Sequence, residues 1–353
     1  MRQDVYGTSQ DSRNLSISFF GMRRAESQKS LSEIVFRNIK LYSIKMAEKI
    51  RSHYIPKFYL EGFLSPLKRK PTLYLYEKGN SEIRRASPED AAVIKGYYSI
   101  DSPQSNIDEN IVENILSLVE SYSAPVIRKI KNKEELNNDD RENFSVFLGY
   151  MLTRVPQHRK MTEDLSAKAA KSLLMAQASH KEGFEVLLKQ YEKDTGKKIN
   201  YPVEKLRRFL MDASKYDFKA HPNISLTLMH TAIELAPIFI EMNWSFWGAT
   251  DESKYITSDN PLYYFDRTAP SHEGAGLINK NIELYFPVSR DIMFVGSWHN
   301  ISGYRKSDSN NVRGWNKNTI IFALRFVFAS QYSEGLNRIV QRYIDSAPKV
   351  EVI

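Results

Sequence analysis

Two stretches far apart in the chain carry side chains that could move a proton or hold an anion. HYIPKFYLEGF (53–63) begins with His53, and YITSDNP (255–261) contains Asp259 and Asn260. Histidine titrates near neutral pH, so His53 could donate and accept a proton without extreme burial. Asp259 could act as a general base or a metal ligand, and Asn260 could orient a substrate or stabilise developing negative charge. Together, these imidazole, carboxylate and amide side chains predict acid–base chemistry.

Arginine supplies the third kind of group. Arg154 and Arg159 lie five residues apart in LTRVPQHR (152–159), so they diverge around a helix, and Arg154 is the better inward candidate. An inward guanidinium would clamp a carboxylate or phosphate with a bidentate fork. We expect Tyr59 to position the substrate. Asn316, at the expected start of a helix, would direct that helix N-terminus at an anion.

Each of these residues also has a purely structural interpretation. His53 could form a hydrogen bond that docks the segment after it on the core, and the TSDNP side chains could close a local Asx turn before proline. Arg154 could form a buried salt bridge, with Asp259 itself as one partner. Asn316 could serve only as a helix N-cap.

Metal and cofactor signatures are weak or absent in the sequence. His272, His299 and Asp266 lie on predicted loops, but without the His-x3-His or His-Glu-x2-His spacing of strong metal sites, so a divalent metal stays open. There is no P-loop, no G-x-G-x-x-G after a strand and no G-x-S-x-G elbow. These absences disfavour nicotinamide, flavin and P-loop nucleotide cofactors, and hydrolases built on a nucleophile elbow.

The elements that must position these residues alternate between strand-like and helix-like patterns. Alternating apolar residues and aromatics predict strands near the start and the end of the chain, with helices between them. The strand predictions are a hairpin from 72 to 87 and runs over 92–100, 243–250, 254–259, 261–265, 282–289 and 291–298. The first helix prediction covers 108–133 and is kinked or broken at Pro125. The second starts at the acidic NNDDREN stretch (137–143), continues to 155 and is broken near Pro156. Further helices are predicted over 163–192, 202–215, 222–241, 316–330 and 333–344. RTAPSHEGAGL (267–277) is a loop and a candidate lid.

This order predicts an α+β fold, with antiparallel β-regions near both ends of the chain packed on a central, mostly helical layer. We expect the two β-regions to share one sheet or to face the same helices. We treat residues 50–353 as one domain. Residues 1–49 are expected to be a loosely attached extension, and Met46 is an alternative translation start.

Composition sets the limits on function. The chain has 353 residues, is 42% hydrophobic and has no cysteine, which excludes disulfides and thiolate zinc sites and fits a cytoplasmic location. The stretch 228–242 is too short and too interrupted by charge to span a bilayer, so we expect no membrane association. The net charge is +8, but residues 1–52 hold ten Lys and Arg against five Asp and Glu. Nucleic acid is therefore only weakly supported as a partner.

Several separated motifs resemble one family. HYIPKFYLEGF, LYLYEK (73–78), GYYSID (96–101), LTRVPQHR, YITSDNP, YFPVS (285–289) and the Asn316-led helix resemble the bacterial domain-of-unknown-function family 4238, from about residue 50 to 330. The chain departs from the family pattern at 151–153 and at Lys57, where glutamine is common. The resemblance implies no particular activity, because the family has none assigned.

These observations lead to two functional hypotheses. The first is an enzyme, a hydrolase or transferase acting on an anionic, phosphate-bearing substrate such as nucleic acid. In it His53 is the acid/base, Asp259 the base or metal ligand, and Arg154 the anion clamp. The second is a non-catalytic binding module, for example in a bacterial defence or toxin system, in which the same groups only hold the fold together. The oligomeric state stays open.

Overall fold

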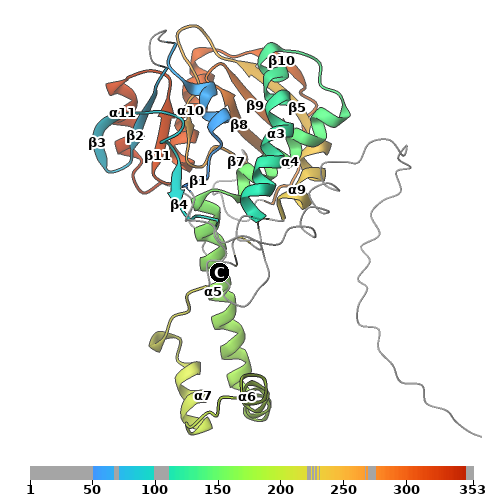
Figure 1. Ribbon diagram of the computed structural model, residues 1–353, viewed down its shortest axis with the longest axis vertical. Helices are drawn as coiled ribbons and strands as arrows, with labels where there is room; N and C mark the ends of the chain where they lie inside the picture. The colour runs from blue at the N-terminus through green and yellow to red at the C-terminus, as the bar shows by residue number, and fades with distance from the viewer. Residues whose placement is uncertain are drawn as a thin grey trace, which may run out of the picture.

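The computed structural model describes residues 51–66, 71–98, 111–220, 224, 226, 229, 231–266, 268 and 276–346. The expected extension, residues 1–49, lies outside these ranges, as does most of the candidate lid. Figure 1 shows a body of sheets and helices from which a helical arm projects. The fold is α+β, as the sequence predicts.

A five-stranded sheet forms the centre of the body. Its strands are β5 (Asn243–Gly248), β7 (Tyr263–Asp266), β8 (Ile282–Ser289), β9 (Ile292–Ser297) and β10 (Gly303–Lys306), in the order β10-β5-β9-β8-β7. The neighbours are antiparallel except β10, which pairs parallel with β5. Every residue of β8 and β9 is buried, because helices cover both faces of the sheet. Both strands are mainly apolar, as is typical of central strands, although β8 also buries Glu283.

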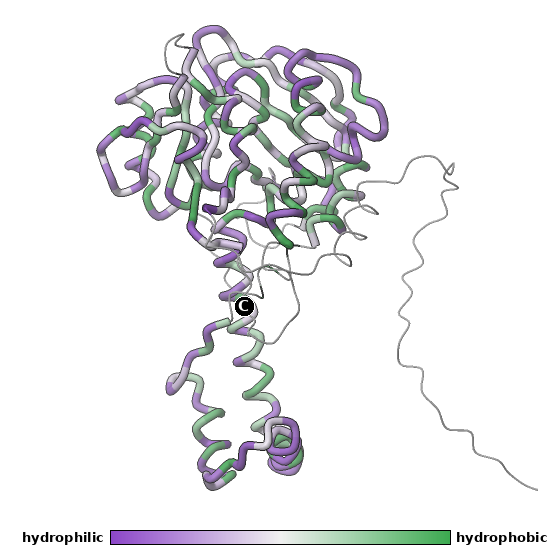
Figure 2. The backbone as a smooth tube through the Cα atoms, viewed as in Figure 1, coloured by the Kyte–Doolittle hydropathy of each residue, from purple (hydrophilic) through white to green (hydrophobic). Residues whose placement is uncertain are grey.

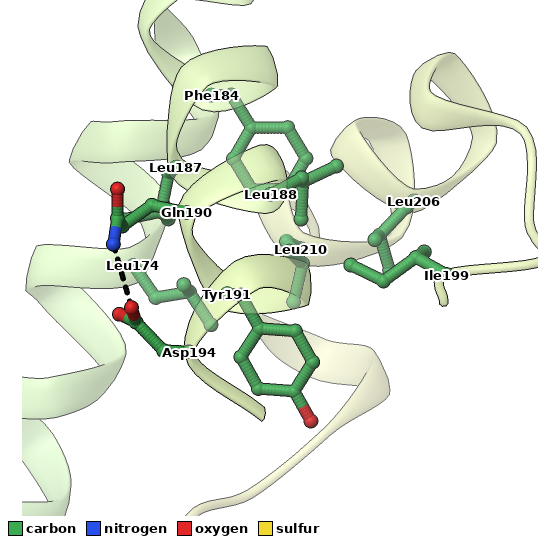
Figure 3. A pocket seen from close by; sticks show the side chains of 10 residues that line it. All are labelled: Leu174, Phe184, Leu187, Leu188, Gln190, Tyr191, Asp194, Ile199, Leu206 and Leu210. Carbon is green, nitrogen blue, oxygen red and sulfur yellow. Dashed lines mark hydrogen bonds between the residues drawn. The ribbon is translucent and has the colours of Figure 1, made fainter. Parts of the chain in front are cut away.

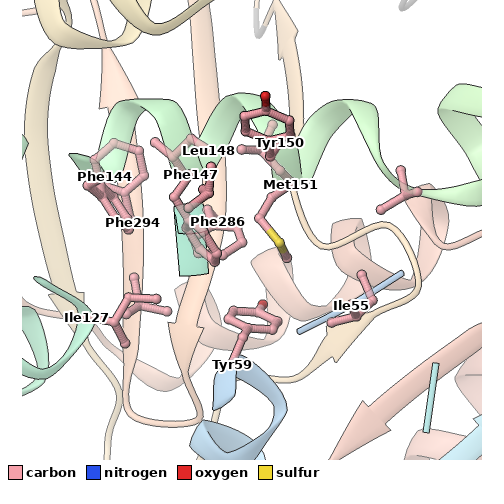
Figure 4. Close-up of a cluster of buried hydrophobic side chains, with 14 of the residues drawn as sticks. Ile55, Tyr59, Ile127, Phe144, Phe147, Leu148, Tyr150, Met151, Phe286 and Phe294 are labelled. Atoms are coloured by element: carbon pink, nitrogen blue, oxygen red, sulfur yellow. The ribbon is translucent and has the colours of Figure 1, made fainter. Parts of the chain in front are cut away.

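Three helices cover one face of this sheet: α3 (Ile111–Asn132), α4 (Asn138–Thr153) and α9 (Thr231–Glu241). Helix α3 continues through Pro125. Helix α4 begins at a capping box, in which the Asn137 side chain accepts from the N–H of Asp140 and Asp140 returns the bond. Aromatic rings fill the interface between α4 and the sheet, with the Phe144 and Phe294 centroids 5.3 Å apart (Figure 4).

The opposite face carries α10 (Ser309–Phe322), which separates the large sheet from a smaller one. Stacked rings join them, with the Tyr263 and Phe322 centroids 4.9 Å apart. The smaller sheet contains β2 (Leu73–Glu77), β3 (Asn80–Ala86), β6 (Thr257–Ser258) and β11 (Phe326–Ala329), in the order β3-β2-β11-β6. Helix α11 (Glu334–Arg342) packs against this sheet. The two ends of the domain therefore share a sheet, one of the two predicted arrangements.

One predicted helix is wrong in its bounds. The run 316–330 is not a single helix, because α10 starts seven residues earlier at Ser309, ends at Phe322, and is followed by β11. Strand β10 was not predicted, since its four residues are all exposed and show no alternation. The helices predicted over 333–344 and around 137–155 agree with α11 and α4.

The HYIPKFYLEGF stretch folds as β1 (Arg51–His53), helix α2 (Lys57–Leu60) and a 3-10 turn over Glu61–Phe63. Strand β1 pairs antiparallel with β4 (Val93–Lys95). Ile55, Leu60 and Phe63 are fully buried and anchor the segment in the main core. The sequence assigned these residues that anchoring role.

Three further helices form the arm: α5 (Pro156–Ser179), α6 (Lys181–Thr195) and α7 (Val203–Met211). Helix α5 starts at Pro156, where proline fits the first turn, and runs away from the body (Figure 1). Helices α6 and α7 pack near its far end, and apolar and polar residues alternate along all three (Figure 2). The expected central helical layer is therefore divided, since α3, α4 and α9 cover the sheet while α5, α6 and α7 project from it.

Candidate functional site

Arg154 lies directly after α4, and its guanidinium is enclosed in a polar network. Only 3% of the side chain is exposed. Nε donates to the Tyr98 hydroxyl at 3.2 Å, Nη1 to Glu120 Oε1 at 2.8 Å, and Nη2 to the main-chain carbonyl of His53 at 2.6 Å. Burial alone would lower the pKa of Arg154, but Tyr98 and Glu120 raise it overall, so the group stays charged. Arg154 thereby ties β1 and α3 to the end of α4.

The imidazole of His53 has a different neighbour. Its Nε2 lies 3.2 Å from the main-chain carbonyl of Glu89, beside the Arg51–Asp90 ion pair. Among the described residues, the imidazole forms no hydrogen bond with Arg154 or Asp259. Arg154 meets only the main chain of His53. The structure therefore brings two of the three proposed catalytic residues together through a carbonyl group.

Asp259 lies at the end of β6 and is 2% exposed. Oδ1 accepts from the main-chain N–H of Leu324 at 2.9 Å, and Oδ2 accepts from those of Arg325 and Phe326 at 2.7 and 2.8 Å. Burial raises the pKa of Asp259 to about 6, while these N–H donors and the charge of Lys78 act in the opposite direction. The carboxylate thus holds the turn from α10 into β11.

Two more side chains hold the same turn. Asn260 Nδ2 donates to the carbonyl of Phe322 at 2.9 Å, and Lys78 Nζ donates to that of Ala323 at 2.6 Å. Both carbonyls lie at the C-terminus of α10, where helical acceptors have no partner within the helix and a cation is favourable. Burial lowers the pKa of Lys78 to about 8, and the charge of Asp259 opposes this shift.

The local turn of SDNP is closed by Ser258, whose Oγ accepts from the Asn260 N–H at 3.2 Å.

Tyr59 and Asn316, the remaining candidates, also bridge distant segments. The Tyr59 hydroxyl is buried and lies 2.7 Å from both Thr257 Oγ1 and the carbonyl of Pro287, so it joins α2 to both sheets. Asn316 accepts from the N–H of Ile256 at 3.1 Å and donates to the carbonyl of Lys254 at 2.8 Å. It lies inside α10, whose N-cap is Asp308, so its assignment to a helix start was wrong.

The partners in these networks were not identified from the sequence. Tyr98 and Glu120 carry the Arg154 contacts, Lys78 follows β2, and Thr257 precedes the SDNP motif by one residue. A single tyrosine after a strand, or a single lysine before a turn, forms no repeating sequence pattern from which a buried contact could be predicted. Lys78, Tyr98 and Thr257 lie in the quoted motifs LYLYEK, GYYSID and YITSDNP, but nothing in the local sequence indicates which distant groups they contact.

The predicted loop residues that the structure describes, Asp266 and His299, form no metal centre. Asp266, at the end of β7, accepts from the Thr268 N–H at 2.7 Å and from Asn279 Nδ2 at 3.2 Å. His299 lies in the turn after β9, and His272 is outside the described residues. In the described ranges, no group of three or more His, Asp or Glu could hold a metal ion.

A pocket of about 440 Å³ opens in the arm (Figure 3), at the end of α5 that lies away from the body (Figure 1). It lies between all three arm helices, and most of the side chains that line it are apolar. They are Leu174 from α5, Phe184, Leu187, Leu188, Gln190, Tyr191 and Asp194 from α6, Ile199 from the connector, and Leu206 and Leu210 from α7. Gln190 donates to Asp194 at 2.6 Å on one edge. We call this pocket the arm groove.

Comparison with known proteins adds the family but no activity. No described helix is both long and apolar enough to cross a membrane. No curated protein matches the chain. No solved structure matches it either. A family model does match residues 51–333, which spans both β-regions, the SDNP motif and the arm. The chain therefore belongs to the family described as protein of unknown function DUF4238.

Proposed function

We propose that this protein is a non-catalytic interaction module, in which the α+β body is a rigid support and the arm of α5, α6 and α7 contacts a partner. Two features support the proposal. The side chains of Arg154 and Asp259 are occupied in holding the fold, and the arm exposes apolar surface that the described part of the chain does not cover.

The body offers few free groups for catalysis among the proposed residues. Asp259 uses both carboxylate oxygens on main-chain N–H groups, and Arg154 uses all three nitrogens of its guanidinium. Both side chains are almost completely removed from solvent. A general base or an anion clamp must reach its substrate within hydrogen-bonding distance, and these two groups are sealed behind their partners. Their arrangement favours stabilisation of the fold.

The exposed apolar surface of the arm is the single observation that carries the proposal. Between residues 163 and 220, only Ala178 and Phe184 are buried. Leu173, Val186 and Phe209 are 61%, 66% and 41% exposed. Half of the large apolar side chains that are exposed in the described part of the chain lie between residues 163 and 220. Grouped exposed apolar side chains mark interaction sites, whereas scattered ones carry no such meaning.

Site-specific photo-crosslinking tests the proposal. A photoreactive amino acid replaces Val186 on the arm in the full-length chain, expressed in its native cells. A matched control carries the same amino acid in place of Ile339, which is 40% exposed on α11 of the body. We expect a discrete crosslinked species at Val186 and none at Ile339. The proposal fails if Val186 gives no discrete adduct, or if both positions give the same one.

Catalysis is the second candidate function, and the raised pKa of Asp259 favours it. A carboxylate with a pKa of about 6 is close to the value that suits a general base near neutral pH. Activity of the wild type, His53→Ala and Asp259→Asn on a broad panel of phosphate-bearing substrates tests this candidate. Turnover by the wild type that both variants lose while keeping their melting temperatures would establish it.

A further inference from the structure

We infer that the arm groove binds a small molecule with an apolar body and one protonated amine. This inference goes beyond the proposed function, because the groove is separate from the outward side chains on which that function rests. Three observations carry it: the size of the groove, its apolar lining, and the carboxylate at its edge.

The groove has the size and the lining of a site for a small ligand. Its volume of about 440 Å³ is within the roughly 300–1,000 Å³ of pockets that hold such ligands. Leu174, Leu188 and Leu206 come from three different helices and line it together (Figure 3). All three leucines are partly exposed, whereas Phe184 beside them is buried. An apolar ligand body would cover the leucines and remove their exposed area from water.

One edge of the groove is polar and negatively charged. Gln190 and Asp194 lie one turn apart on α6, both are exposed, and Gln190 Nε2 donates to Asp194 Oδ1 at 2.6 Å (Figure 3). Among the described residues that line the groove, Asp194 alone is charged, and it forms no ion pair with any described residue. Lys189 and Lys193 lie on the face of α6 away from the lining side chains, because of the helical repeat. The charge that a ligand meets at this edge is therefore negative.

This edge favours a cation that donates hydrogen bonds. An ammonium group has three N–H donors, and both the Asp194 carboxylate and the Gln190 amide oxygen can accept from them. A negatively charged head group would be repelled by Asp194. With its amine at the exposed edge, the ligand would place its apolar body against the leucines. The ammonium would stay in contact with water there, which avoids the cost of burying a charge.

The side chains that suit a protein partner lie elsewhere on the arm. Leu173, Val186 and Phe209 are more exposed than the leucines of the groove, and none of the three lines it. A protein on that outer surface and a small molecule in the groove can therefore be bound at the same time.

Three ligands that share one alkyl chain and differ only in the head group test the inference: decylamine, decanol and decanoate. Isothermal titration calorimetry with the full-length protein measures their affinities, below the concentrations at which the ligands aggregate. We expect decylamine to bind about two- to fivefold more tightly than decanol at low salt, as for an exposed ion pair. Decanoate should bind most weakly, and salt should narrow these differences.

The variant Asp194→Asn removes the charge at the edge and leaves the apolar lining in place. It should abolish the preference for decylamine over decanol without changing the affinity for decanol. The control Asp164→Asn makes the same change at an exposed carboxylate of α5 outside the lining, and should keep the preference.

A second pair of variants tests whether the ligands bind in the groove. In Leu188→Trp the larger side chain should occupy the groove and weaken all three ligands by about tenfold, the equivalent of about two buried methylene groups. Leu173→Trp introduces the same side chain at a position that is 61% exposed and outside the lining, and should bind all three ligands as the wild type does. Equal helix content by circular dichroism confirms that the variants retain the arm.

The inference fails if the three ligands bind with equal affinity, if decanoate binds most tightly, or if none binds. It also fails if Leu188→Trp leaves binding unchanged. A dimer that sedimentation detects and that Leu188→Trp disrupts would assign the groove to a second copy of this chain. Binding of decylamine only after removal of residues 1–49 would assign the groove to the N-terminal part of the chain itself.

Discussion

Arg154 Nη2 donates to the main-chain carbonyl of His53 over 2.6 Å, while the His53 imidazole lies against the carbonyl of Glu89. The contact joins the segment before α2 to the end of α4, two places 101 residues apart in the chain. It is a connection between elements of the body, formed without the titratable ring of His53. Asp259 also connects distant elements, but through its carboxylate, which accepts hydrogen bonds from main-chain N–H groups of the turn after α10.

Replacing Arg154 should destabilise the fold strongly. Arg154→Met removes the donors to His53, Tyr98 and Glu120 and leaves the buried acceptors without partners, which should cost about 3 kcal/mol in free energy of unfolding. Arg208→Met makes the same change at a side chain that is 79% exposed, and should cost less than about 0.5 kcal/mol. Urea denaturation measures both. Equal unfolding midpoints for the two variants would contradict the structural role of Arg154.

The free energy of unfolding should decrease as the pH rises from about 4 to above 6, because of Asp259. Its pKa is about 6 in the folded protein, above the 3.8 of an ordinary aspartate side chain, so the folded state binds the proton more tightly than the unfolded state between these two pH values. The contribution of Asp259 is therefore complete below about pH 4 and is lost as the pH rises through 6, on the order of 3 kcal/mol.

Asp259→Asn cannot titrate and isolates this effect. The stability advantage of the wild type over Asp259→Asn should be largest near pH 4 and should shrink towards pH 7. Denaturation curves of both proteins across this range measure the difference. An advantage that grows with pH would mean that the three N–H donors outweigh burial and hold the pKa below its usual value.

Two helical glycines should respond to alanine in opposite directions. A Cβ on Gly149 in α4 would lie 2.1 Å from the carbonyl oxygen of Ala232 in α9, so Gly149→Ala must push the helices apart. We expect a loss of about 3 kcal/mol or failure to fold. A Cβ on Gly183 in α6 would meet only the Cβ of His180, at an ordinary contact distance of 3.9 Å, and Gly183→Ala should stabilise by up to about 1 kcal/mol through helix propensity. Thermal unfolding of the pair measures this contrast, and a tolerated Gly149→Ala would contradict the close helix crossing.

The hydroxyl of Tyr59 should contribute measurably to stability. Tyr59→Phe keeps the buried ring but removes the bridge to Thr257 and Pro287, and should cost about 1–2 kcal/mol. Tyr201→Phe deletes the same atom at a residue that is 57% exposed, and should leave the free energy of unfolding nearly unchanged. Chemical denaturation of the two variants decides the prediction. A silent Tyr59→Phe would show that water replaces both partners.

Local patterns determined much of the fold. The aromatic and β-branched residues of 282–289 and 291–298 predicted the strands that the structure shows as β8 and β9. The acidic NNDDREN stretch predicted the start of α4, and Pro156 predicted the break before α5. These signals could be found in the sequence because each depends on interactions between residues that are close together in the chain.

Tertiary structure decided what local patterns could not. The apolar residues after Asn316 contain no break signal, yet α10 ends at Phe322 because Asp259 and Asn260, more than 60 residues away, hold the turn that follows. The sequence by itself determined that the polar groups of SDNP require partners. Only the folded chain decided that these partners are main-chain groups of a distant turn, because hydrogen-bond partners across long separations are set by packing.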